Sequence, residues 1–383
     1  MHTLIKMITL TIVASVFVFV GCEEEEQVKT LDKDTAVQTL ETNSQEIEAS
    51  MKEMENSEGM KVLRTLDSLM RLDDPFSKAD IKASKNEFIV SSLRASMKPT
   101  PVRKAKRLGN EPFDFQNHTG TYTWQAEGKW HYSQQEPSDT IMFEFPSDSA
   151  QETNNATLIL SEYTEIEAKD TANNTVYLPA RIKANLYEDG EEVGNIDYTM
   201  VYNDNNDMVT SLEADVFLKP YTWDIDFNQN TVAGTFQKTG QETPILSFSF
   251  DITFMDNLQD IKELQGNLRL HDMNFKGWIE PYDLAQLEED DFWEEQGWRT
   301  MDEALEYANN QFDIALYKFS TNDKLADLKV VNQTEEDEAS DIAVDYVFVF
   351  KDGSTKSAEE VFDNIVVFLQ NMMNRYSIPQ PEY

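Results

Sequence analysis

Residues 246–254 read LSFSFDITF, in which every second side chain is apolar and the side chains between are polar. This period of two is typical of a β-strand that buries one face and exposes the other to water. The same alternation recurs at Ile182, Ala184 and Leu186, at Leu212, Ala214, Val216 and Leu218, and at Trp223, Ile225 and Phe227. About ten short strands follow one another from Thr119 without intervening helices, which predicts an antiparallel meander.

Apolar residues at helical spacing occur both before and after this strand-rich region. Residues 45–72 and 77–97 predict two helices of a hairpin, with prolines ending each. Residues 281–290 and 301–318 predict further helices, residues 342–350 a strand, and residues 357–375 a last helix. We therefore predict an α+β fold: a large curved antiparallel sheet, a half-barrel-like meander, covered by helices and preceded by the N-terminal helical hairpin.

The first residues have the features of an export signal. After the positive Lys6, residues 7–20 carry no charge, a run shorter than the roughly 20 apolar residues of a membrane-spanning helix. The run ends at Gly21-Cys22, and Cys22 is the single cysteine of the chain. This edge resembles the lipobox of bacterial lipoproteins, which implies cleavage before Cys22 and a lipid on its thiol. The alternative is an ordinary signal peptide with an incidental cysteine.

Four acidic residues, Glu23, Glu24, Glu25 and Glu26, follow the cysteine directly. The run resembles the surface-export signal of Bacteroidota lipoproteins; the alternative is the start of a solvated linker. We expect a protein anchored by lipid in the outer membrane and exposed at the cell surface, with the periplasmic face left open. The predicted order is a signal peptide at 1–21, a lipidated acidic tether at 22–44, a helical hairpin and linker at 45–110, and a β-rich main domain with C-terminal helices at 111–383.

Charge narrows the classes of partner. Acidic residues outnumber basic ones 71 to 32, for a net charge of −39. Such a field repels phosphate backbones, so we expect no nucleic-acid partner. The one basic cluster, residues 103–107, predicts either a dock for an acidic partner or a solvated linker.

Several motifs together resemble a family of uncharacterised Bacteroidota outer-membrane and surface lipoproteins. They are NHTGTYTW at 117–124, IMFEFP at 141–146, NATL at 155–158 and FKDGS at 350–354. The motifs belong to strands and turns. The resemblance implies the membrane address and the β-rich core, and it brings no established activity or site residues.

The sequence contains few motifs that are typical of metal-binding or catalytic sites. The histidines after the signal, His118, His131 and His271, are far apart, so we expect no zinc site. Residues 203–207 alternate like the start of a calcium loop, although a polar hairpin turn needs the same residue types. No serine, cysteine or nucleotide motif stands out. We therefore predict no cofactor, no metal and no enzyme.

Two tryptophans are the last candidates for a binding site. Trp293 and Trp298 lie in an acidic stretch outside the alternating pattern, where aromatic rings beside carboxylates and amides suit glycan binding. The alternative is that both rings close the end of the sheet. The leading hypothesis is a non-enzymatic surface lipoprotein that binds a glycan or a protein partner. Two alternatives stay open: a carrier of an apolar or lipid ligand in the curved sheet, and a carboxylate-dependent glycoside hydrolase.

Overall fold

The structure of the protein is a computed structural model. It describes residues 29–73, 75–76, 112–134, 139–169, 175–203, 209–255, 261–286, 301–332 and 344–362. The chain divides into two units. Unit 1 comprises residues 1–51, 230–234 and 242–383, and unit 2 comprises residues 52–229 and 235–241.

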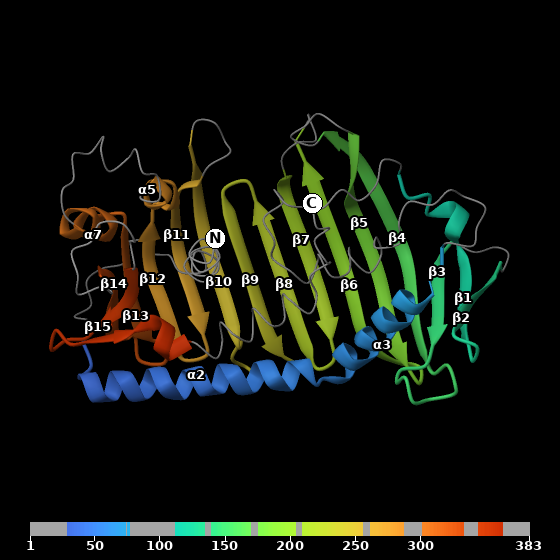
Figure 1. Cartoon of the computed structure of the whole chain (residues 1–383), viewed down its shortest axis with the longest axis horizontal. Coiled ribbons are helices and arrows are strands. Elements are labelled where there is room, and N and C mark those ends of the chain that lie inside the picture. The colour runs from blue at the N-terminus through green and yellow to red at the C-terminus, as the bar shows by residue number, and fades with distance from the viewer. Residues whose placement is uncertain are drawn as a thin grey trace. The chain divides into compact units, whose positions relative to one another are not determined.

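The strands form one open sheet of 16, and Figure 1 labels all of them except β16. They are β1 Gly120–Gln125, β2 Lys129–Ser133, β3 Ile141–Phe145, β4 Ala156–Lys169, β5 Thr175–Glu188, β6 Glu191–Tyr202, β7 Val209–Leu218, β8 Tyr221–Asn228, β9 Thr231–Lys238, β10 Leu246–Phe254, β11 Ile261–Leu270, β12 Met273–Ile279, β13 Phe312–Lys318, β14 Asp323–Asn332, β15 Val344–Val349 and β16 Thr355–Ser357. Their order is β16 down to β3 in sequence, then β1 and β2. The pair β1–β3 is parallel, which makes the meander a mixed sheet. The predicted α+β class with a large open sheet is confirmed.

The helices differ from the prediction in their bounds. They are α2 Lys33–Glu55, α3 Glu58–Leu72, the 3₁₀ turn η2 Gln116–His118, α5 Pro281–Gln286 and α7 Met301–Asn310. The predicted tether is therefore too long, because its residues 33–44 already belong to α2. Asp32 caps this helix: its carboxylate accepts hydrogen bonds from the backbone N–H and the hydroxyl of Thr35. The single helix predicted for 45–72 is broken between α2 and α3, and the predicted helix 77–97 lies outside the described residues.

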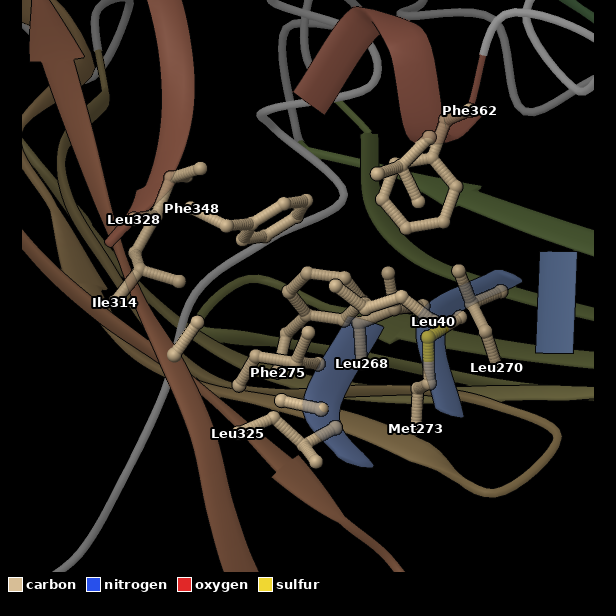
Figure 2. Packing of buried hydrophobic residues seen from close by; sticks show 14 of the residues in the cluster. Leu40, Leu268, Leu270, Met273, Phe275, Ile314, Leu325, Leu328, Phe348 and Phe362 are labelled. Carbon is tan, nitrogen blue, oxygen red and sulfur yellow. The ribbon is translucent and has the colours of Figure 1, made fainter. Parts of the chain in front are cut away.

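The core of unit 1 lies between α2 and the sheet. Ala36, Leu40 and Ile47 follow one stripe of α2 and are almost fully buried. Figure 2 shows Leu40 among Leu268 and Met273, which come from β11 and β12. The apolar face of strands β10 to β14 is thus filled by the chain's own side chains.

Two glycines on β11 and β12 let the strands of unit 1 come close together. Gly266 and Gly277 face each other in the register, and their φ values are +155° and +151°. A Cβ on Gly277 would lie 1.7 Å from the carbonyl oxygen of Asp313, and one on Gly266 would lie 1.9 Å from that of Ser249. No other residue type fits at either position without moving the backbone.

Unit 2 has its own core. Helix α3 buries Met60, Val62, Leu66 and Leu69. Phe76, just beyond the helix, packs edge-on against a group of rings from η2, β1 and β3 and the segment before them. These rings are Phe113, His118, Tyr122 and Phe143. Edge-to-face packing of this kind adds about 0.5–1.5 kcal/mol per pair to the burial itself.

The C-terminal part contains one wrong prediction. Residues 301–318 are not one helix, because α7 ends at Asn310 and residues 312–318 form β13. Phe312, Ile314 and Leu316 are buried at a period of two, which is the strand pattern. The predicted strand at 342–350 is confirmed as β15, and residues 358–362 begin the predicted last helix. Among the described helices, none combines the length and the apolar character that crossing a membrane requires.

Candidate binding surface

The residues that the sequence singled out lie outside the described part of the chain. They are Cys22, Glu23, Glu24, Glu25, Glu26, Trp293 and Trp298. The basic cluster at 103–107 and most of the calcium-like stretch at 203–207 also lie outside it. Any site that the structure supports must therefore come from other residues.

The strongest candidate is the outer face of unit 1, opposite the core that packs on α2. Side chains on neighbouring strands line up there in rows, because strand residues alternate between the two faces. One row runs Ser247, Arg269, Asn274, Tyr317, Lys324 across β10 to β14, and the next runs Ser249, Asn267, Lys276, Ala315, Asp327. We call Ser247, Ser249, Asn267, Arg269, Asn274, Lys276, Tyr317 and Lys324 the Tyr317 surface. It combines hydroxyls, amides, cations and an aromatic ring.

Arg269 is held in place from two sides. Its Nε donates a hydrogen bond of 2.9 Å to the carbonyl oxygen of His271, and its guanidinium lies 3.3 Å from the ring centre of Phe319. Partial burial lowers the pKa of Arg269, while Asp272 acts in the opposite direction. An arginine remains charged at neutral pH after such a shift. Arg269 is thus a fixed cation at one end of the surface.

Tyr317 lies next to two lysines. The ammonium of Lys276 is 5.1 Å from the ring centre of Tyr317, and it donates a hydrogen bond to Asn322. Lys324, the register partner of Tyr317, forms an ion pair of 2.7 Å with Asp327. The pKa of Tyr317 is raised, chiefly by partial burial, so its hydroxyl is neutral at physiological pH and can donate or accept a hydrogen bond.

Asn274 sits between Arg269 and Tyr317 and is 8% exposed. Its amide oxygen is buried and has no hydrogen-bond partner among the described residues. An unsatisfied buried acceptor costs about 1–3 kcal/mol, so such atoms usually have a function or a missing partner.

The outer face of unit 2 carries mostly acidic side chains, unlike the Tyr317 surface of unit 1. Two rows across β5 to β8 carry Lys183, Asp197, Asp215, Asp224 and Arg181, Thr199, Glu213, Asp226. Arg181 and Lys183 form ion pairs with Asp197, and the hydrogen bond from Arg181 lowers the pKa of that carboxyl most. Burial raises the pKa of Asp224, and the facing Asp215 adds to the effect. The face is a solvated acidic surface on which carboxylates of neighbouring strands face one another: Asp197 and Asp215, Asp215 and Asp224, and Glu213 and Asp226.

Ser50, His271 and Glu46 lie in the order of a hydrolytic triad. The hydroxyl of Ser50 is 3.2 Å from Nε2 of His271, and Nδ1 of His271 is 4.0 Å from the carboxylate of Glu46. The second distance is too long for a hydrogen bond. Ser50 lies inside α2, where backbone N–H groups bond to the preceding turn and cannot form an oxyanion hole. The contact therefore serves to dock α2 on the β11–β12 turn.

Glu165 is another carboxyl group whose pKa is perturbed. Burial raises its pKa, and hydrogen bonds from Tyr163 and from the backbone of Phe113 act against this. The tyrosine hydroxyl donates to one carboxylate oxygen at 2.6 Å, and the N–H of Phe113 donates to the other at 2.8 Å. Both oxygens have partners, so the group fixes local structure.

Within the residues that the structure describes, no three His, Cys, Asp or Glu side chains are placed to hold a metal ion. No family model, curated protein or solved structure matches the chain. The resemblance to Bacteroidota lipoproteins therefore stays a prediction from sequence. Sequence reasoning missed the Tyr317 surface because its residues come from five strands, and a register cannot be read from alternation alone.

Proposed function

We propose that this protein is a non-enzymatic lipoprotein, anchored through Cys22 in the outer membrane and exposed at the cell surface, that binds a glycan. The single cysteine at the edge of the apolar leader and the acidic run after it support the anchor and the address. The Tyr317 surface supports the ligand class.

The observation that carries the proposal is the row of Arg269, Asn274 and Tyr317 on adjacent strands. Neighbouring strands lie about 4.8 Å apart, so the row places a guanidinium and an aromatic ring roughly 10 Å apart, with the mostly buried Asn274 between them. A sugar ring offers C–H groups to an aromatic face and hydroxyls to amide and guanidinium groups at its rim. Rigid strands hold these groups better than a loop would.

The alternatives have weaker support. A lipid carrier needs an apolar cavity, whereas the apolar face of unit 1 is packed by Leu40, Leu268 and Phe275 among others. A glycoside hydrolase needs two carboxyls across a bound sugar, and Asp215 with Asp224 is the pair that favours this candidate. Loss of sugar cleavage on changing Asp224→Asn would support it.

The proposal is tested by binding of residues 23–383 to an array of bacterial and host glycans. Tyr317→Ala should weaken binding at least tenfold, which corresponds to about 1.4 kcal/mol. Tyr187→Ala is the matched control, because Tyr187 is also half-buried on an outer strand face, in unit 2. Trp293→Ala and Trp298→Ala test the rings that the sequence indicated. Equal binding by the wild type and Tyr317→Ala would remove the Tyr317 surface as the site.

A further inference from the structure

We infer that the saccharide held by the Tyr317 surface carries a carboxylate or a sulfate, an inference that rests on the proposed function. Charge is the first reason. In a chain with 71 acidic residues, the two rows of this surface hold Arg269, Lys276 and Lys324. Asp327 is the one acidic residue in these two rows, and it pairs with Lys324. The next row of the same face carries Asp251 and Asp313.

Arg269 and Lys276 are cations without an ion pair among the described residues. Lys276 binds the neutral amide of Asn322, and Arg269 binds a backbone carbonyl through Nε. The terminal nitrogens of Arg269 have no hydrogen-bond partner in the described part of the chain. A guanidinium presents these donors as a planar fork that matches the two oxygens of a carboxylate or two oxygens of a sulfate.

The position of Arg269 makes it ready to bind. The stacked ring of Phe319 and the carbonyl of His271 fix the side chain before any ligand arrives. Less rotamer entropy is then lost on binding, so more of the interaction energy remains as affinity. Lys276 is half-exposed and has a long side chain, and it can leave the face of Tyr317 to contact the same anion.

The surrounding protein limits the size of the ligand. Screening at physiological salt confines electrostatic effects to about 8 Å, so a short acidic saccharide responds to the local cations. A long polyanion would also meet the acidic remainder of the protein, whose net charge is −39.

The test compares a uronic-acid trisaccharide with its methyl ester, and a sulfated trisaccharide with the same sugar without sulfate, by calorimetric titration of residues 23–383. We expect at least one charged form to bind tenfold or more tightly than its neutral partner. Raising the salt concentration should weaken the charged form alone. Arg269→Gln should abolish the preference, Arg269→Lys should restore part of it, and Lys276→Gln should reduce it.

The controls distinguish a loss of folding from a loss of binding. They also distinguish the preference for an anionic saccharide from saccharide binding itself. Lys183→Gln removes a cation from the outer face of unit 2 and should leave the preference unchanged. Thermal unfolding of Arg269→Gln shows whether the fold survives, and Lys276→Gln tests the charge at a more exposed position. Equal binding of charged and neutral forms would overturn the inference and keep the proposed function. Failure of the wild type to bind any saccharide would overturn both.

Discussion

Replacing Gly277 by alanine should destabilise unit 1 severely. The new Cβ would lie 1.7 Å from the carbonyl oxygen of Asp313, where an ordinary contact is 3.4 Å or more. The φ of +151° adds strain, because side chains other than glycine rarely adopt it. A strained backbone costs about 1–3 kcal/mol and forced overpacking a further 1–3 kcal/mol, so we expect a loss of about 2–6 kcal/mol in unfolding free energy.

The matched control is Gly240→Ala. Gly240 also has a positive φ, +84°, but no atom lies within 4 Å of the place that a Cβ would take. Its substitution carries only the left-handed strain of roughly 1–2 kcal/mol.

Hydrogen exchange at the amides of β12 and β13 is the suitable assay, because the two units need not unfold together. The Gly277→Ala protein should lose protection there, and the control should not. Equal protection in both variants would refute the claim that close strand approach requires this glycine. The Tyr317 surface depends on the close approach of these strands. Gly277 and Gly266 face each other directly beside Lys276 and Asn267, which belong to that surface.

Three further predictions concern the anchor, the core and pH. Cys22→Ala should move the protein from the membrane fraction to the soluble fraction, and unchanged fractionation would contradict the lipid anchor. Leu40→Ala should cost about 2–5 kcal/mol in chemical denaturation, because Leu40 is 0% exposed in the unit 1 core; a loss under about 1 kcal/mol would mean that α2 is loosely packed. Burial lowers the pKa of His271, with Glu46 opposing and Arg269 reinforcing the shift, so the unfolded chain takes up the proton first and stability falls as pH drops below about 6.5. His271→Gln should flatten the change in unfolding free energy between pH 7 and pH 5, and an unaltered slope would contradict the assignment.

The sequence predicted the strands better than the helices. The stretch 246–254 coincides with β10, and Ile182, Ala184 and Leu186 are buried on β5, because a period of two is a direct consequence of strand geometry. The start of α2 could have been found, since Asp32 is a capping residue and Ala36, Leu40 and Ile47 continue the helical stripe. The predicted helix at 301–318 is wrong in its second half, because a short apolar run fits the period of a helix as well as that of a strand.

The Tyr317 surface could not be predicted, and the reason is physical. Arg269, Asn274 and Tyr317 become neighbours only through the register of β11, β12 and β13. That register depends on backbone approach at Gly266 and Gly277 and on turns whose conformations the sequence does not specify. Ser50 and His271, which are 221 residues apart, meet for a similar reason.

Side-chain footprinting of residues 23–383 by hydroxyl radicals, with and without a saturating saccharide, tests the glycan site most directly. We predict that Tyr317 is modified in the free protein and protected in the complex, while Tyr187 on unit 2 is modified equally in both. Unchanged modification of Tyr317 at saturation, or protection confined to Trp293 and Trp298, would contradict the placement of the glycan on the outer face of unit 1.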